Sequence, residues 1–254
     1  MSQGGSSERI GFLRAAIARI ETQNPAGALA QSAAQGRLCE ITPATSADGA
    51  AACGFALSLA IAAAERPGLI VWVMEDFVFH ENGAPYGPGL HHHGLPMERF
   101  VLVRTEGPRQ TLWALEEALK SRACAAAIGE LRDGARHFDL PATRRLTLAA
   151  RAGRSEGLLL HTRPAQGLST AAQLRFEVCG QPGPTLASAG GRRPIPTLPA
   201  WGVRVLKARA ADGQYGRPDA ERRREMVWGR SLPQHKGQAD GSLSLGSDRR
   251  QKLA

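Results

Sequence analysis

The 254-residue sequence predicts an α/β fold: a mostly parallel sheet flanked by helices, with antiparallel strands near the C-terminal end. Three observations predict it. Between residues 36 and 165, short apolar runs alternate with longer segments of helical periodicity. Some of these runs are apolar throughout, as strands buried on both faces of a parallel sheet are. After residue 165, apolar and polar residues alternate, which is typical of half-exposed antiparallel strands.

The composition divides the chain into four predicted parts. They are an N-terminal amphipathic helix with a linker, an α/β core, C-terminal antiparallel strands that complete the core, and a disordered tail, over residues 1–35, 36–165, 166–230 and 231–254. The N-terminal helix covers residues 8–21. Four apolar side chains share one of its faces: Ile10, Leu13, Ile17 and Ile20. This N-terminal stripe is expected either to pack on the chain's own domain or to dock on another chain.

The elements of the core follow in order along the chain. Strands are predicted at residues 37–41, 69–75, 100–105, 124–131 and 157–161. Helices are predicted at residues 50–64, 108–121 and 139–153, the last with an Asp cap and an early proline. Loops are predicted at residues 42–49 and 76–97. The half-exposed strands beyond the core are predicted at residues 174–178, 201–210 and 225–228.

Composition and charge narrow the function classes. No apolar run approaches the roughly 20 residues of a membrane span, and the start lacks a signal-peptide pattern, so we expect a cytoplasmic protein without membrane contact. The four cysteines are far apart and are expected to be reduced core residues. The formal net charge is +9, and residues 201–254 carry 12 basic against 6 acidic residues. This balance favours contact with polyanions or acidic proteins.

The first strand–loop–helix turn, Thr42 to Gly54, is where a sheet of this kind binds its ligand. A P-loop there cradles phosphates with backbone N–H groups and reaches the terminal phosphates with a lysine. No lysine precedes residue 120, and Asp48 adds a negative charge and is expected to cap the following helix. Asp48, Gly49 and Gly54 therefore mark a degenerate P-loop, and efficient Mg-nucleotide hydrolysis is not expected. Weak anion binding at the helix N-terminus is the alternative.

Two acids at strand ends, Glu75 and Glu130, fit a vestigial site. Carboxylates at such positions activate water or hold Mg²⁺ in working nucleotide hydrolases. The structural alternative is a pair of solvated or salt-bridged loop acids. Adjacent histidines, as at His91, His92 and His93, rarely present two rings to one tetrahedral ion. We therefore assign no catalytic residue, no metal and no cofactor.

A basic patch is predicted at Arg222, Arg223 and Arg224. Arginine forks suit phosphates, so the patch could give weak, salt-dependent, non-specific DNA contact. A solvated face or a contact to an acidic partner surface is the alternative.

The chain resembles the ImuA family, within the RecA fold, over about residues 8–230. Four stretches carry the resemblance: GRLCEITPATSADGAAACGFALSLA (36–60), LIVWVMED with APYGPGLHHHGLPMERFVLVR (69–76, 84–104), PRQTLWALEEALKSRACAAAIGEL (108–131) and DLPATRRLTLAARAGRSEGLLLH (139–161). The runs YGPGL and WALEEAL are the most characteristic.

The resemblance implies a bacterial SOS-induced protein with a RecA-like fold and a degenerate Walker A motif. It implies a role in error-prone translesion synthesis with an ImuB-like protein and a DnaE-type polymerase. We expect an accessory or adapter protein, not an enzyme, that could also regulate RecA. By resemblance to RecA, the N-terminal stripe would dock on RecA or on a second copy.

Two alternatives stay open at this point. One is a weak RecA-like ATPase that uses Glu75 or Glu130 with a phosphate-binding arginine such as Arg37. The other is a SulA-like SOS inhibitor of cell division, although the SulA family is much shorter than this chain.

Overall fold

The computed structural model describes residues 36–132, 134–165, 167, 169–183, 185–186, 195–196, 199–208 and 224–227. The N-terminal stripe and the predicted disordered tail lie outside these residues, as do Arg222 and Arg223. Arg224 is described by its backbone alone, as the first residue of a strand.

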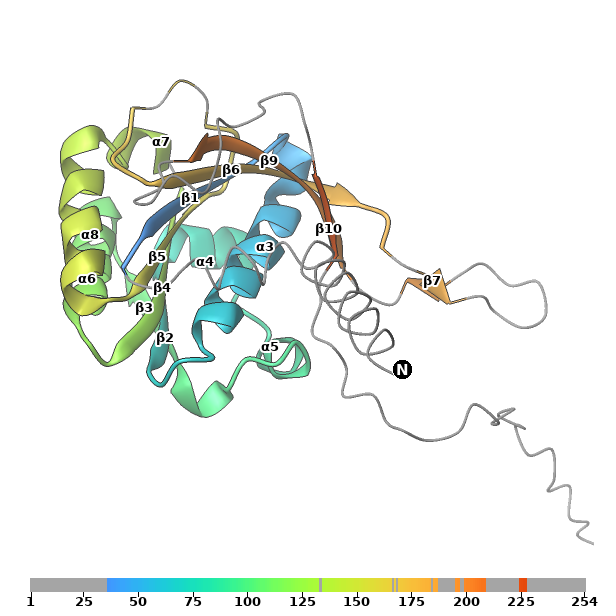
Figure 1. The fold of residues 1–254 in the computed structure, drawn as a ribbon, viewed down its shortest axis with the longest axis horizontal. Helices are drawn as coiled ribbons and strands as arrows, with labels where there is room; N and C mark the ends of the chain where they lie inside the picture. Colours follow the sequence, from blue (N-terminus) through green and yellow to red (C-terminus); the bar gives the residue numbers. More distant parts are fainter. Residues whose placement is uncertain are drawn as a thin grey trace, which may run out of the picture.

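The centre of the molecule is an eight-stranded sheet with the order β10-β9-β6-β1-β5-β4-β2-β3 (Figure 1). Its strands are β1 (Leu38–Pro43), β2 (Leu69–Glu75), β3 (Phe100–Thr105), β4 (Cys124–Leu131), β5 (Glu156–His161), β6 (Leu174–Gln181), β9 (Ala200–Ala208) and β10 (Arg224–Val227). The six strands from β3 to β6 pair in parallel, and β9 and β10 are antiparallel. A separate pair joins β7 (Thr185–Leu186) to β8 (Ile195–Pro196). The predicted fold class is confirmed.

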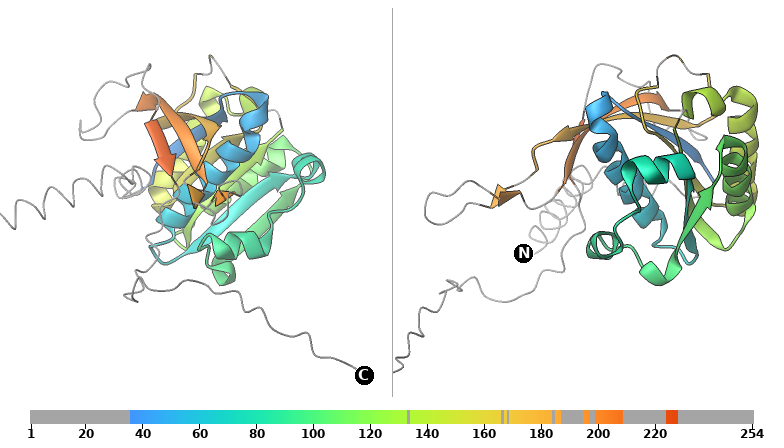
Figure 2. Two further views of the ribbon diagram at one scale, coloured as in Figure 1. Left: turned by 90° about the vertical axis from the view of Figure 1, so that its right-hand side faces the viewer. Right: turned by 180° about the vertical axis from the view of Figure 1, so that it is seen from behind.

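Helices cover the sheet from both sides, and each side has its own apolar core (Figures 1 and 2). Helix α3 (Gly49–Ala63) packs on one face, and α6 (Pro108–Lys120) and α8 (Leu140–Gly153) pack side by side on the other. Short helical turns connect these layers: η1 (Ser46–Asp48), α4 (Asp76–Asn82), α5 (Gly87–His92), η2 (Met97–Arg99) and α7 (Gly134–His137).

Helix α3 has no charged residue, because its surroundings are apolar on most sides. Phe55, at its centre, is fully buried and meets Phe176 and Trp201 edge to face, with ring centroids 5.5 and 6.0 Å apart. Within the described part of the chain, Ser46–Ala63 is the one stretch long and apolar enough to cross a membrane by composition. The helix packs on β1, β4, β5 and β6, and its buried side chains belong to the apolar core on that side of the sheet.

Helix α8 shows how local sequence signals set an element's ends. Asp139 is its N-cap, and its carboxylate accepts a hydrogen bond from the Ala142 N–H at 2.8 Å, as predicted. Gly153 is the last helical residue. A Cβ at this position would collide with the backbone of Leu119 and Lys120, so glycine allows the C-terminal ends of α6 and α8 to meet.

Two sequence predictions about this fold were wrong. Residues 76–97 are not one loop, because α4 and α5 form there, anchored by Val78 and Leu90 in the core under α3. These helices are six or seven residues long, too short to show a clear period in the sequence. Strand β6 is not a half-exposed antiparallel strand, since it is mostly buried and pairs in parallel with β1 and antiparallel with β9.

Candidate functional site

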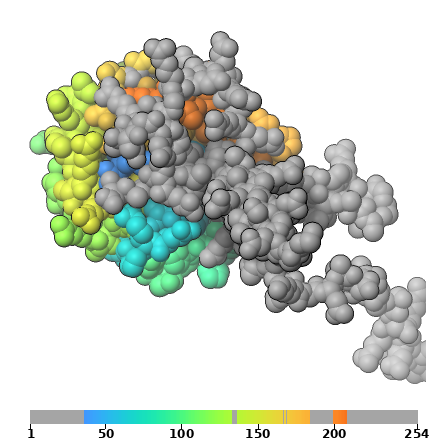
Figure 3. Space-filling model, in the orientation of Figure 1, coloured from blue at the N-terminus to red at the C-terminus, as the bar shows by residue number. Residues whose placement is uncertain are grey.

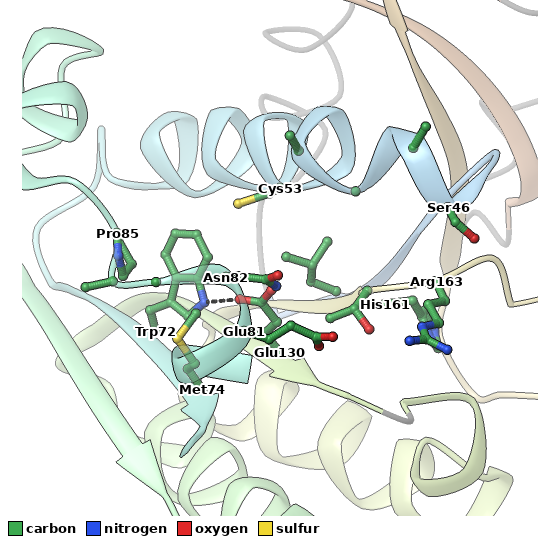
Figure 4. Close-up of a pocket in the computed structure, with 17 residues that line it drawn as sticks. Ser46, Cys53, Trp72, Met74, Glu81, Asn82, Pro85, Glu130, His161 and Arg163 are labelled. Carbon is green, nitrogen blue, oxygen red and sulfur yellow. Dashed lines mark hydrogen bonds between the residues drawn. The ribbon is translucent and has the colours of Figure 1, made fainter. Parts of the chain in front are cut away.

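A cavity of about 760 Å³ opens at the carboxyl ends of β2, β4 and β5, beside the N-terminus of α3 (Figure 4). This is the edge at which doubly wound sheets bind ligands, and the position predicted from the sequence. The residues that line it and carry the following argument are Ser46, Ala47, Trp72, Asn82, Glu130 and Arg163.

The loop between β1 and α3 uses its own backbone donors. The Ala44 N–H donates to the Val178 carbonyl at 2.8 Å, and the Asp48 N–H to the Thr45 carbonyl at 3.0 Å. The Thr45 N–H donates to the Asp48 carboxylate at 3.0 Å, and the Ala47 N–H to the Thr45 hydroxyl at 3.3 Å. A phosphate cradle needs such N–H groups pointing at the ligand. Here the protein itself satisfies four of them.

Asp48 is the N-cap residue of α3, as predicted, but its side chain makes no cap hydrogen bond there. Its carboxylate instead closes a capping box on η1, where it accepts the Thr45 hydroxyl at 2.6 Å. The other carboxylate oxygen accepts the Gly180 N–H of β6 at 2.9 Å. The Asp48 carboxylate thus links the loop between β1 and α3 to strand β6 of the sheet. Gly49 begins α3 and lines the cavity, and Gly54 packs against the Trp201 ring.

Glu130 is the buried acid of the cavity. It is 5% exposed and accepts a hydrogen bond from Trp72 Nε1 at 3.1 Å (Figure 4). Burial raises the pKa of Glu130 to about 7, although hydrogen bonds from Trp72 and Asn82 oppose the rise. Burial, with the nearby Glu130 charge, also raises the pKa of the Cys53 thiol to about 12. Neither group is therefore tuned as a nucleophile, but Glu130 can hold or release a proton near neutral pH.

Glu75 does not join Glu130 in one site. Met74 belongs to the core under α3 and Val73 to the core under α6 and α8, so the next residue points to the second face. Glu75 accepts the Arg132 N–H at 3.2 Å and does not line the cavity. The prediction that both strand-end acids belong to one vestigial site was thus wrong: of these two acids, only Glu130 lines the cavity.

Arg37 is at the wrong end of the sheet to bind phosphate at this loop. It precedes β1 and lies 3.9 Å from Glu156 at the amino end of β5. Arg163, which follows β5, lines the cavity instead. Its position just after a predicted strand was a signal that sequence reasoning missed. Asn82 was missed because its segment was predicted to be a loop.

A buried charge network joins β1, β5 and β6. The Glu40 carboxylate, 1% exposed, accepts hydrogen bonds from His161 Nε2 at 2.8 Å, Thr170 Oγ1 at 2.7 Å and Arg175 NH2 at 2.7 Å. Burial alone would raise the pKa of Glu40, but His161, Thr170 and Arg175 together lower it. A second cavity of about 300 Å³ borders this network beside Arg175 and Arg204. Nothing in a single strand predicted this cluster, because its members come together only in the sheet.

The histidine run lies on and after α5, with His91 and His92 exposed. Partial burial and the neighbouring His92 lower the pKa of His93. In the described part of the chain, no group of three or more His, Cys, Asp or Glu side chains could hold a metal ion. All four cysteines are free thiols.

Fold and site together define a class: an α/β domain with a cavity at the carboxyl edge of a mostly parallel sheet and no lysine in the loop between β1 and α3. No family model matches the chain. Over 120 residues it is 36% identical to Protein ImuA from two strains of Caulobacter vibrioides, covering 47% of this chain and 45% of each relative. The matched part thus spans about half the length of these curated relatives. This similarity confirms the predicted resemblance to the ImuA family.

Among solved structures, the chain is similar to SulA from Pseudomonas aeruginosa, with 16% identity and a TM-score of 0.35. That similarity covers 48% of this chain and 92% of the SulA chain.

Proposed function

We propose that this protein is an accessory factor of SOS-induced mutagenic DNA synthesis that acts through contacts with other proteins and not through nucleotide hydrolysis. The similarity to Protein ImuA supports the cellular role. The structure of the loop between β1 and α3 supports the absence of nucleotide hydrolysis. Its backbone donors are bonded within the protein, its carboxylate lies where phosphates would add negative charge, and no lysine precedes residue 120.

The cost of phosphate binding at this loop follows from these bonds. A phosphate would have to displace the Asp48 carboxylate from Thr45, and the displaced carboxylate would also leave the Gly180 N–H. Hydrogen bonds to a charged group are worth roughly 1.5–3 kcal/mol each. Among the described residues, no lysine lines the cavity beside the loop to offset this loss. Binding of Mg-ATP is therefore expected to be weak or absent.

The proposed partners are an ImuB-like protein, a DnaE-type polymerase and RecA. The N-terminal stripe Ile10, Leu13, Ile17 and Ile20 is the proposed contact to a partner chain. A pull-down with purified candidate partners tests it, using the double variant Leu13→Asp with Ile17→Asp. Loss of one partner with retention of the folded core is expected, and retention of every partner would contradict the assignment.

Calorimetric titration with Mg-ATP tests the non-catalytic role, alongside thermal unfolding at millimolar Mg-ATP. A ligand at 100 times its dissociation constant stabilises the native state by about 2.7 kcal/mol, so binding would appear as a higher unfolding midpoint. We expect no heat of binding and no shift.

The cavity with Glu130 and Arg163 favours one alternative function, a weak ATPase. A shift with Mg-ATP, together with phosphate release that Glu130→Gln abolishes, would establish that alternative and overturn the adapter role. Trp113→Ser, which changes a residue 67% exposed on α6 and outside the cavity, is the matched control.

A further inference from the structure

The outward face of α8 collects arginine side chains. Helical spacing places seven exposed residues on this face: Leu140, Pro141, Arg144, Arg145, Leu148, Arg151 and Ala152. Arg154, also exposed, follows directly as the C-cap. The helix contains no acidic residue, and its Asp139 cap is bonded to the Ala142 N–H. In Figures 1 and 3, α8 lies at the outer left side of the molecule.

Most of this charge is uncompensated within the described part of the chain. Arg145, with a side chain 62% exposed, lies 3.5 Å from the Glu116 carboxylate of α6. Glu116 also pairs with Lys120 at 2.9 Å, so this acid is shared between two cations. Neither Arg144 nor Arg151 has an ion pair or side-chain hydrogen bond to any described residue.

The acids of the fold do not balance this face. Five glutamates are buried in or at the ends of strands: Glu40, Glu75, Glu130, Glu156 and Glu177. No described lysine or arginine is buried to the same degree. These buried acids count in the net charge but do not face solvent beside α8. The surface of α8 is therefore more basic than the net charge of the core residues suggests.

From this arrangement we infer that the outward face of α8 binds the phosphodiester backbone of DNA through Arg144, Arg145 and Arg151. The arginine face could bind any polyanion, and the inference rests on the proposed function only in choosing DNA. Arg144 and Arg151 are two helical turns apart, roughly 10 Å along the axis. Over that length one DNA strand carries about three phosphates. Arginine supplies 28 of the 32 basic residues, and its planar fork suits phosphate oxygens better than an ammonium group does.

The binding is expected to be independent of base sequence. Contacts to phosphates carry no sequence information, and no described aromatic side chain of α8 offers a surface for base stacking. Leu148, 59% exposed between the arginines, is not required for backbone contact. An acidic protein segment with an apolar anchor would instead depend on Leu148. This residue therefore separates the two kinds of partner.

Fluorescence anisotropy of the full-length protein tests the proposal, with a labelled 30-nucleotide single strand and a 30-base-pair duplex between 20 and 200 mM salt. For Arg144→Gln with Arg151→Gln we expect at least a tenfold loss of affinity at 50 mM salt. The slope of log affinity against log salt should fall by about 1.4 on the single strand, or about 1.8 on the duplex, for two lost phosphate contacts. Comparison of the two probes shows which form of DNA is preferred.

Three controls keep the proposal falsifiable. Arg222→Gln with Arg223→Gln removes the same charge from the sequence-predicted basic patch, and should weaken binding less than the α8 pair. Glu116→Gln frees Arg145, while Lys120 keeps its pair with Glu117 at 2.9 Å, and should tighten binding. Leu148→Ser should leave DNA affinity unchanged. Arginine and glutamine have similar helix propensities, so circular dichroism should show an intact fold in the α8 pair.

Several results would overturn the proposal. One is that the unchanged protein does not bind DNA at 20 mM salt. Another is that Arg222→Gln with Arg223→Gln loses as much DNA affinity as Arg144→Gln with Arg151→Gln, or more. Equal binding of poly-glutamate, lost in the same α8 variant and in Leu148→Ser, would assign this face to an acidic protein instead. The assay uses purified protein, so its failure leaves the proposed mutagenic role untouched, and failure of that role leaves the binding result standing.

Discussion

Replacement of Glu40 by alanine is expected to be among the most destabilising single changes in this fold. Glu40 is 1% exposed, and its carboxylate accepts four hydrogen bonds, two of them from the Arg175 guanidinium at 2.9 and 2.7 Å. The side chain of Arg175 is only 11% exposed, so the variant leaves a cation largely buried without its counter-charge. His161, 2% exposed, also loses its partner.

The magnitude follows from the burial of both partners. Breaking a buried ion pair by removing one member costs about 3–5 kcal/mol, which is a large fraction of a domain's total stability. Urea unfolding measures this cost as a lower midpoint at unchanged slope. Glu177→Ala is the matched control: its partner Arg204 has a side chain 36% exposed, so water can solvate the freed cation and the loss should be smaller.

The pH dependence supplies a second readout of the same network. The folded-state pKa of Glu40 is lowered from its ordinary value of 4.5. Its contribution to stability is therefore present above about pH 4.5 and is lost as the pH falls through the lower folded-state value. Glu40→Gln should lack this part of the acid transition. A loss below about 1 kcal/mol for Glu40→Ala at pH 7, or an unchanged acid transition in Glu40→Gln, would refute the reasoning.

Three further predictions concern the cavity and the helices. The pKa of Glu130 is about 7 against an ordinary 4.5, so the stability of the unchanged protein falls as pH rises between these values. Glu130→Gln should therefore be more stable than the unchanged protein at pH 8, by up to about 3 kcal/mol, and equally stable at pH 4. Gly153→Val should separate α6 from α8 and lower the urea midpoint. Asp48→Ala should cost about 1–2 kcal/mol, through the loss of its bonds to Thr45 and Gly180, and gain no affinity for Mg-ATP in calorimetry.

The sequence was sufficient for the parts of the fold that depend on local pattern. The apolar run of β2 and the capped α8 appear with ends within a residue of prediction. The short α4 and α5 were missed because two turns of helix leave little periodicity. The neighbours of β6 could not be read from its own residues, since pairing partners are set by tertiary packing.

The site was predictable in place but not in detail. The degenerate loop was found because a P-loop has a fixed position and spacing, and its lysine is absent. Which acid faces the cavity depends on strand register, and a shift of one residue moves a side chain to the other face of the sheet. That is why Glu75 and Glu130 were wrongly grouped. The Glu40 network joins residues more than 100 positions apart, which no sequence spacing indicates.

Damage-induced mutation frequency in the organism that carries this gene tests the central claim most directly. It should be measured in a strain that lacks this gene, complemented either by the unchanged protein or by Ala47→Trp, which blocks the mouth of the cavity. We predict that deletion abolishes the induced increase and that both proteins restore it. An undiminished increase after deletion would contradict the mutagenic role, and failure of a folded Ala47→Trp protein to restore it would contradict action without a nucleotide.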